Sequence, residues 1–237
     1  NPSGSGPDPR RKTAHAHQAL VEAQRETLAA ASHELRSPLA RIRMAVELLA
    51  ENGDPGLRAR VERDVEDLDE LIEEILLASR LSTLERPQHL ERIDLQALAA
   101  EEAARAGAEF SGEPVTVAGE GRLLARLVRN LLENAARHAP GSTALVEVEA
   151  QDGHALLRVL DRGPGVPEAE RERIFEPFYR REGRREDRDD DRGVGLGLSL
   201  VRQIARRHGG DARCLPRNGG GACFEVRLPI EGNEAAS

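Results

Sequence analysis

The stretch Ser32-His33-Glu34-Leu35-Arg36-Ser37-Pro38 places a histidine and a carboxylate side by side within a heptad repeat. Two apolar series make up that repeat, one recurring every seven residues and one falling four residues later: Leu28, Leu35, Ile42 and Leu49, with Leu39 and Val46. This pattern is typical of a coiled-coil seam, with the first series at d and the second at a. His33 then occupies a b position, just outside the seam. We therefore expect a long amphipathic helix that presents His33 to a second molecule or domain.

Pro38 lies inside this helical pattern, which runs from about residue 14 to residue 50. A proline removes the hydrogen bond to the Glu34 carbonyl and clashes with that carbonyl. Because the heptads continue through Pro38, we expect a kinked helix rather than a helix end. The kink lies one turn from His33, whose neutral imidazole can act as a nucleophile beside the Glu34 carboxylate. For the His-Glu pair taken alone, an ordinary surface histidine is the simpler interpretation.

A second amphipathic run follows the turn-forming residues 51–56. Its apolar residues alternate at spacings of four and three: Leu57, Val61, Val65, Leu68, Ile72 and Ile75. Two such helices joined by a short loop form an antiparallel hairpin. A single hairpin leaves much of its apolar stripe in water, so we expect residues 14–85 to pair with a second copy. The prediction is an all-α helical hairpin that forms a four-helix bundle in a homodimer.

Composition excludes several classes of protein. The chain has 237 residues, of which 34 are basic and 42 acidic, and its net charge of −8 argues against a nucleic-acid-binding surface. It contains no apolar run of about 18 residues and no signal-peptide pattern, so these residues predict neither a membrane span nor secretion. Residues 1–13 are rich in Pro, Gly and Ser, which indicates a disordered linker or a cloning remnant, and residues 231–237 a flexible tail.

The two cysteines, Cys214 and Cys223, fit no metal-ligand spacing. We interpret them as reduced thiols in the core of a cytosolic protein. A disulfide across the hairpin that they flank is the minor alternative.

A second domain is predicted over residues 86–230, because the pattern changes after Pro87 to alternating helices and strands. Asp94 is a suitable N-cap for a helix to about residue 106. Further helices are expected at 121–138, weakly at 168–174, and from the 193–197 glycines to 208. Strands are expected at 114–117, 143–150, 155–160, 211–215 and 222–228. Residues 180–192 contain no apolar side chain and predict a solvated loop. These elements predict an α+β sandwich, a mixed sheet covered on one face by helices.

Three features of this domain suggest a nucleotide site. Alternate glycines in the segment 193–197 precede a helix, so backbone amides there can approach a polyphosphate. The segment Asp161-Arg162-Gly163-Pro164-Gly165 ends a strand with a carboxylate and two small residues. Asn130 and Asn134 share one helix face, and their amide oxygens suit a hydrated Mg²⁺ held largely by phosphate. Each feature alone is more often an ordinary turn or polar surface.

Together, five motifs resemble the H, N, G1, F and G2 boxes of sensor histidine kinases of bacterial two-component systems. They are, in the family's order, His33 in SHELRSPL, Asn130 to Asn134, Asp161 to Gly165, Phe175 to Phe178, and Gly193 to Gly197. The resemblance covers about residues 14–230. It implies an ATP-binding fold of the gyrase, Hsp90, histidine kinase and MutL type, attached to a dimerisation and phosphotransfer hairpin.

The resemblance also implies a role for each matching residue. His33 would be the phosphoacceptor and Glu34 the carboxylate that orients or deprotonates it. Asn134 would be the main Mg²⁺ ligand with Asn130 close by, and Asp161 would accept from the adenine amino group. The residues expected to contact ATP are Asn130, Asn134, Arg137, His138, Asp161, Gly163, Gly165, Arg180, Gly193, Gly195, Leu196, Gly197 and Leu198. The charged residues 180–192 match the family's ATP lid.

Two departures from the family pattern affect these roles. Arg137 stands where the family usually has lysine, and it offers a planar fork in place of a point charge. Ser37 stands where the family usually has Thr or Asn to orient the water that dephosphorylates the partner regulator. Serine keeps the hydroxyl, so the resemblance allows phosphatase activity as well.

The implied function is an ATP-dependent protein histidine kinase that autophosphorylates His33 and transfers the phosphoryl group to an aspartate of a response regulator receiver domain. A nucleotide-binding signalling scaffold without kinase activity is the main alternative, and an ATPase clamp of the gyrase or MutL kind leaves His33 unexplained. Family members are usually anchored by upstream transmembrane helices. We therefore expect the cytoplasmic portion of an inner-membrane protein, with Arg41 and Arg43 on the surface that selects the regulator.

Overall fold

The structure, a computed structural model, describes residues 39, 42, 44–46, 55–82, 90–179 and 195–230. The chain divides into two compact units, residues 1–82 and residues 83–237. Several sequence predictions fall outside the described residues: His33, Glu34, Ser37, Arg41, Arg43, Arg180, Gly193, the lid, the N-terminal linker and the C-terminal tail.

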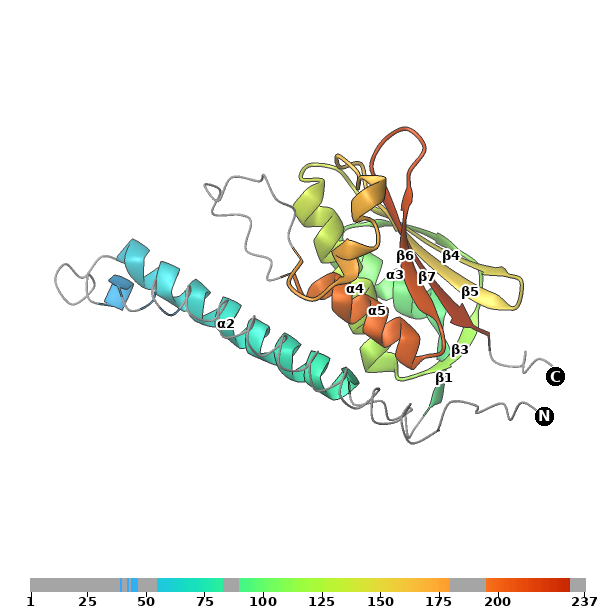
Figure 1. The fold of residues 1–237 in the computed structure, drawn as a ribbon, viewed down its shortest axis with the longest axis horizontal. Coiled ribbons are helices and arrows are strands. Elements are labelled where there is room, and N and C mark those ends of the chain that lie inside the picture. Colours follow the sequence, from blue (N-terminus) through green and yellow to red (C-terminus); the bar gives the residue numbers. More distant parts are fainter. Residues whose placement is uncertain are drawn as a thin grey trace, which may run out of the picture. The chain divides into compact units, whose positions relative to one another are not determined.

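The first unit is helical wherever it is described. Residues 39, 42 and 44–46 are helical, and α2 runs without interruption from Pro55 to Ser82 (Figure 1). The predicted turn at 51–56 is wrong at its last two residues, because α2 already begins at Pro55. Proline suits the first position of a helix, where its missing N–H has no partner to lose.

Apolar residues of α2 form two stripes rather than the single stripe predicted. One stripe is buried and contains Leu71, Ile75 and Ala78. The other is exposed and contains Val65, Ile72 and Leu76. Because the two sets are offset by one residue, they occupy adjoining faces of the helix.

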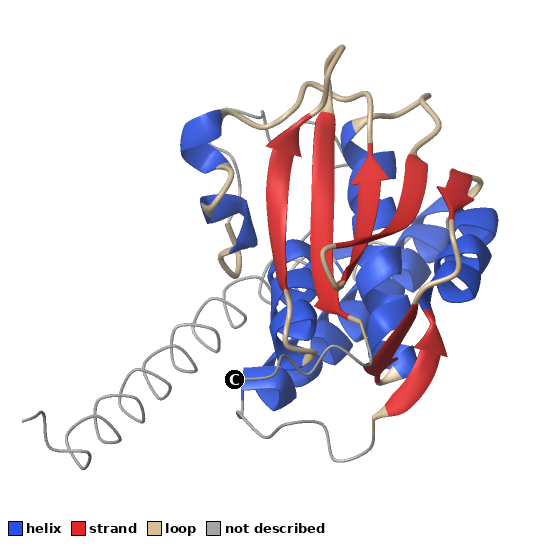
Figure 2. Cartoon of the chain, turned by 90° about the vertical axis from the view of Figure 1, so that its right-hand side faces the viewer, coloured by secondary structure: helices blue, strands red, loops and turns tan. Residues whose placement is uncertain are grey.

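Where it is described, at residues 90–179 and 195–230, the second unit forms a five-stranded sheet, a two-stranded sheet and three α-helices. The elements in chain order are β1 (Glu91–Asp94), α3 (Leu95–Ala106), β2 (Glu109–Gly112), β3 (Thr116–Gly119), α4 (Gly121–His138), β4 (Leu145–Gln151), β5 (His154–Leu160), η1 (Glu168–Glu170), η2 (Arg173–Phe175), α5 (Gly197–Arg207), β6 (Asp211–Pro216) and β7 (Ala222–Pro229). The large sheet has the order β2-β4-β5-β7-β6, and β1 pairs with β3. Helices α3, α4 and α5 cover one face of the large sheet (Figure 2). The predicted helix-covered mixed sheet is confirmed, since β2 runs parallel to β4 and the other pairs are antiparallel.

Local sequence signals explain where several elements begin and end. The Asp94 side chain accepts a hydrogen bond from the N–H of Ala97 at 3.0 Å, which caps α3 as predicted. The predicted helix at 121–138 is α4 to the residue. Asp152 and Gly153 both have positive φ, as a tight hairpin between β4 and β5 requires.

Other elements differ from the sequence predictions. The strand predicted at 114–117 lies at Thr116–Gly119. The strands β1 and β2 were not predicted, because each has four residues and little apolar alternation. The weak helix predicted at 168–174 is two short 3₁₀ turns, η1 and η2.

The core of the second unit lies between the large sheet and its helices. Aliphatic side chains build it, led by Leu124, Leu127, Leu131, Leu157, Leu200, Ile204 and Leu228.

Cys214 and Cys223 are buried and unpaired, which confirms the prediction of reduced thiols. Burial raises the pKa of Cys214 to about 12 and that of Cys223 to about 11. None of the described helices is both long and apolar enough to cross a bilayer.

Candidate nucleotide-binding site

Asp161 follows the last residue of β5 and is buried. Its Oδ1 atom accepts from the backbone N–H groups of Gly163, at 2.8 Å, and Ala222, at 3.2 Å. Its carbonyl oxygen accepts from Nη1 of Arg217 at 2.8 Å. Among the described residues, every side-chain hydrogen bond of Asp161 uses Oδ1. The Oδ2 atom is thereby left to accept from a ligand.

The turn after Asp161 packs closely against its surroundings. A Cβ atom on Gly163 would lie 2.6 Å from the carbonyl oxygen of His138, at the end of α4. A Cβ atom on Gly165 would lie 2.9 Å from the carbonyl oxygen of Gly221, in the β6–β7 loop. Side chains are therefore excluded at both predicted positions, because backbone at the end of α4 and in the β6–β7 loop already fills the space that a Cβ atom would need.

Asn130 and Asn134 lie one turn apart on α4, and both are buried. The Nδ2 atom of Asn130 donates to the carbonyl oxygen of Gly197 at 3.2 Å. Its Oδ1 atom has no hydrogen-bond partner among the described residues. A buried acceptor without a partner costs about 1–3 kcal/mol, so such an atom is usually explained by a bound water or ion. Amide oxygens are ligands that Mg²⁺ accepts, so this pair fits the metal that accompanies ATP.

The G2 glycines lead directly into α5. The N–H of Phe178 donates to the carbonyl oxygen of Gly195 at 3.0 Å. Gly195 has a φ of 79°, and a Cβ atom there would lie 3.0 Å from the backbone of Phe178. Gly197, the first residue of α5, lies beside Asn130. The backbone at the start of α5 is thus next to Asn130, and helix N-termini are places where a phosphate chain can approach the backbone.

The remaining predicted contacts have different environments. Leu196 is completely buried, so its side chain belongs to the core and cannot line an open site. Leu198 and His138 are partly buried, and Arg137 is exposed on the last turn of α4. Contacts thus join the start of α5 to Asn130 on α4. Separate contacts join the turn after Asp161 to His138, at the end of α4, and to Gly221.

Two residues near this site were missed by the sequence analysis. Arg217 comes from the β6–β7 loop and holds the carbonyl of Asp161. Ser199 is buried on α5, and its Oγ atom donates to the carbonyl oxygen of Leu196 at 2.8 Å, which holds the first turn of that helix. Neither belongs to a motif, and both contacts depend on how the backbone folds.

Two family models match the chain. The model described as Histidine kinase-, DNA gyrase B-, and HSP90-like ATPase matches residues 119–232. The model described as His Kinase A (phospho-acceptor) domain matches residues 23–84. The first match contains the candidate nucleotide site, and the second contains His33.

The chain is also similar to curated sensor proteins. The chain is 38% identical over 231 residues to Sensor protein CutS of Streptomyces coelicolor, covering 90% of this chain and 54% of the relative. It is 33% identical over 232 residues to the Probable sensor histidine kinase TcrY of Mycobacterium tuberculosis, covering 92% and 48%. The chain thus spans about half the length of the curated relatives it matches.

Solved structures agree with these matches. A structure of the mycobacterial sensor histidine kinase MprB is 30% identical, with a TM-score of 0.50, and covers 60% of this chain and 98% of that one. A crystal structure of the histidine kinase ThkA in complex with the response regulator protein TrrA has a TM-score of 0.74, covers 95% of this chain and 67% of that one, and at 20% identity supports the fold alone. With a phospho-acceptor domain and an ATPase domain of this type in one chain, the protein belongs to the sensor histidine kinases of two-component systems.

Proposed function

We propose that this chain is the kinase portion of a sensor protein, which autophosphorylates His33 from ATP and passes the phosphoryl group to an aspartate of a response regulator. The observation that carries the proposal is the Asp161 turn. A buried carboxylate has one oxygen fixed by two backbone N–H groups and the other available, in a domain whose family binds ATP. The phospho-acceptor match at residues 23–84 provides the substrate histidine in the same chain.

In this proposal Asp161 recognises the adenine base. Its Oδ2 atom accepts from the exocyclic amino group, while the turn formed by Gly163 and Gly165 receives the ring. The glycines Gly193, Gly195 and Gly197 border the phosphates, where the N-terminus of α5 offers backbone N–H groups. Arg137 and Arg180 supply positive charge for the phosphates in this proposal, His138 is a further contact, and Leu198 lies on the first turn of α5.

Asn134 and Asn130 hold the metal ion in this proposal. The Oδ1 atom of Asn130 is buried without a partner among the described residues, and its Nδ2 atom is engaged by Gly197, so the amide orientation is fixed. When bound, Mg²⁺ offsets the charge that develops on the phosphates. The two asparagines contribute oxygens on one helix face, four residues apart.

His33 is the proposed nucleophile. One imidazole nitrogen forms a bond to the γ-phosphorus as the bond between that phosphorus and the departing ADP oxygen breaks. Glu34 holds the proton on the other ring nitrogen and stabilises the positive charge of the ring. The phosphoryl group then moves from His33 to an aspartate oxygen of the receiver domain, which restores the neutral imidazole. Ser37, four residues after His33, is proposed to orient a water for the opposing activity, which is hydrolysis of the phosphorylated regulator.

The exposed stripe on α2 supports a homodimer. Ile72 is 43% exposed and Leu76 is 51% exposed, although both are large aliphatic residues. In the first helix Leu39, Met44 and Val46 are exposed as well. Several large apolar side chains exposed on the same helices are a mark of protein association. A second copy of the hairpin would cover both sets in a four-helix bundle.

The activity can be tested with radiolabelled ATP and Mg²⁺. We expect the wild-type chain to incorporate label that is lost in acid and stable in base, as a phosphoramidate requires. His33→Gln should abolish the label while leaving ADP affinity unchanged, because acceptor and nucleotide site lie in different units. Labelling that persists in His33→Gln would assign the acceptor to another residue. A chain that binds ADP but incorporates no label would instead be the signalling scaffold. The membrane attachment and cytoplasmic location expected for such sensors are tested on the full-length protein.

A further inference from the structure

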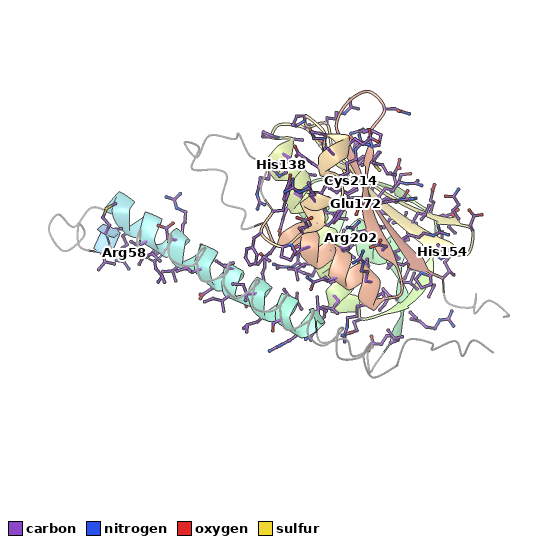
Figure 3. The ribbon with its side chains drawn as sticks, in the orientation of Figure 1. Arg58, His138, His154, Glu172, Arg202 and Cys214 are labelled. Carbon is purple, nitrogen blue, oxygen red and sulfur yellow. The ribbon has the colours of Figure 1, made fainter. Side chains whose placement is uncertain are left out.

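Arg202 connects three segments of the second unit through one guanidinium group. It lies on α5, and its side chain is 13% exposed. Its Nε and Nη2 atoms donate to the carbonyl oxygen of Ala212, in β6, at 3.1 and 2.9 Å. Its Nη1 atom pairs with Glu172, the residue before η2, at 2.9 Å (Figure 3). Its Cζ atom lies 4.3 Å from the centroid of the buried Phe175 ring, at the end of η2.

The segment held by Arg202 returns to the start of α5. Three residues after Phe175, the N–H of Phe178 donates to the carbonyl oxygen of Gly195. Gly195 lies two residues before the start of α5, the helix that carries Arg202. These contacts form a closed ring that runs from Arg202 through η2, Phe178 and Gly195 back to α5.

Backbone strain shows that this ring is under constraint. Phe178 has a φ of 61°, a left-handed conformation that a residue with a bulky side chain adopts rarely. Such a conformation persists where the surrounding structure holds it, and it is concentrated at functional sites. A Cβ atom on Gly195 would lie 3.1 Å from the Cα atom of Phe178, so the two backbones are in close contact. The position of one backbone therefore determines the position of the other.

The ring also borders the candidate nucleotide site. Gly197 follows Gly195 by two residues, and its carbonyl oxygen accepts from Asn130. We infer that Arg202 is a positioning residue for nucleotide binding, which holds η2 against α5 and thereby keeps the Gly195–Gly197 backbone in the geometry that receives the phosphates. This inference rests on the proposed function. Arg202 itself does not touch the nucleotide, so its effect is transmitted through Phe175, Phe178 and Gly195.

The test compares ADP affinity, measured with Mg²⁺ by calorimetry, between the wild-type chain and Arg202→Gln. Glutamine cannot form the two-nitrogen hydrogen bond to the Ala212 carbonyl, the ion pair with Glu172 or the cation–π contact with Phe175. We expect ADP affinity to fall by about threefold to thirtyfold, the range found for residues coupled to a site through packed contacts. The KM for ATP should rise by a similar factor, while kcat at saturating ATP changes less, because nucleotide binding restores the displaced backbone.

Arg206→Gln is the matched control. Arg206 lies one turn further along α5, its side chain is 61% exposed, and it pairs with Asp211 at 3.0 Å. Asp211 also lies 3.4 Å from Nε of Arg202, but among the described residues Arg206 forms no ion pair or hydrogen bond with η2. We expect its ADP affinity to remain within about twofold of the wild type, as for an exposed ion pair. Phe175→Leu should reproduce the Arg202→Gln loss, and Phe175→Tyr, which keeps the ring, should not. In the double variant Arg202→Gln with Phe175→Leu, the two losses should not multiply.

Melting temperatures without nucleotide separate positioning from folding. If Arg202→Gln melts earlier but binds ADP like the wild type at a temperature where it is folded, Arg202 is structural only and the inference is overturned. Equal losses in Phe175→Leu and Phe175→Tyr would also overturn it. If Arg202→Gln does not fold, Arg202→Lys and the two Phe175 variants decide the question by the same criteria. A wild-type chain that binds no ADP would contradict the proposed function instead.

Discussion

The Nε2 atom of His208 accepts a hydrogen bond from the backbone N–H of Glu120 at 3.0 Å, which joins the end of α5 to the start of α4. The Nδ1 atom lies 2.7 Å from the carbonyl oxygen of Ile204, so it carries the proton. Because Glu120 can only donate through its N–H, the native contact requires a neutral imidazole. Burial lowers the pKa of His208, and although the Ile204 carbonyl and the Glu120 carboxylate oppose this effect, Arg207 adds to it.

We expect the free energy of unfolding to fall as the pH drops below about 6.5, the pKa of a histidine in the unfolded chain. In that range the unfolded state binds more protons than the folded state, so the stabilisation present at neutral pH is lost until the pH reaches the lowered pKa. Urea midpoints at pH 7.5 and pH 5.5 measure the effect. His208→Gln should be less stable than the wild type at pH 7.5 and should show a smaller pH dependence. Equal slopes in wild type and His208→Gln would contradict this prediction.

Glu225 should contribute strongly to the stability of the large sheet. Its carboxylate is buried on β7 and accepts from Arg158 on β5 at 2.6 Å and from Arg213 on β6 at 2.8 Å. Burial raises the pKa of Glu225, but the hydrogen bonds from the two arginines lower it by more, so the net pKa is below its ordinary value. The contribution of Glu225 to the free energy of unfolding is therefore present above about pH 4.5 and is lost as the pH falls through the lowered pKa. We expect Glu225→Gln to lower the free energy of unfolding by about 1–3 kcal/mol, because it removes the buried negative charge that both guanidinium groups share.

The control for Glu225 is Glu149→Gln. Glu149 pairs with Arg158, one of the two arginines that Glu225 binds, at 2.6 Å, but the Glu149 side chain is 46% exposed. Denaturant titration should show a loss below about 1 kcal/mol for this variant. Comparable losses in the two variants would show that burial of the carboxylate is not what determines its contribution.

Asp161→Asn should leave the fold intact while changing base recognition. The amide keeps an oxygen for the N–H groups of Gly163 and Ala222, and it places an NH₂ group where the Oδ2 atom stood. That group opposes the amino group of adenine, so ADP affinity should fall by about tenfold to a hundredfold, as expected for an unpaired buried donor. Guanine has a carbonyl at the equivalent ring position, so the ratio of GDP to ADP affinity should rise. Calorimetry with both nucleotides provides the measurement, and unchanged ADP affinity would make Asp161 a turn residue only.

Disruption of the exposed α2 stripe should separate the proposed dimer. Ile72→Glu with Leu76→Glu places two charges where a second copy would pack, and burying such charges unpaired is strongly unfavourable. Sedimentation equilibrium should show a monomer or a dimer weakened by at least about a hundredfold. Arg63→Glu also adds an acidic group to α2, at an exposed position, and should remain dimeric. A double variant that stays fully dimeric would place the interface on another surface.

Cys214 and Cys223 should be unreactive while the protein is folded. Their pKa values of about 12 and about 11 leave very little thiolate at pH 8, and thiolate is the reactive form. A chromogenic disulfide reagent should react rapidly with no thiol of the folded protein in buffer and with both thiols of the protein unfolded in urea. One rapid thiol under native conditions would show that the β6–β7 hairpin opens readily.

The amino-acid sequence by itself determined the elements whose signals are local. The α4 helix was predicted to the residue, because its apolar period is strong and its asparagines fall four apart on one face. The Asp94 cap and the turn at Asp152 depend on neighbouring residues only, so they too could be predicted. The order of the five motifs was sufficient to identify the family, since their co-occurrence carries more information than any one of them.

Only the tertiary structure decided how distant segments meet. The four-residue strand β2 is too short to show a period, and its parallel pairing with β4 spans a whole helix. The bond from Asn130 to Gly197 and the bond from Arg217 to Asp161 each join residues more than fifty positions apart, so no local pattern indicates them. The sequence likewise showed that α2 is amphipathic but not that its apolar residues divide into a buried and an exposed stripe. That division depends on which face the rest of the folded chain covers, because burial is a property of the packed molecule rather than of the residue.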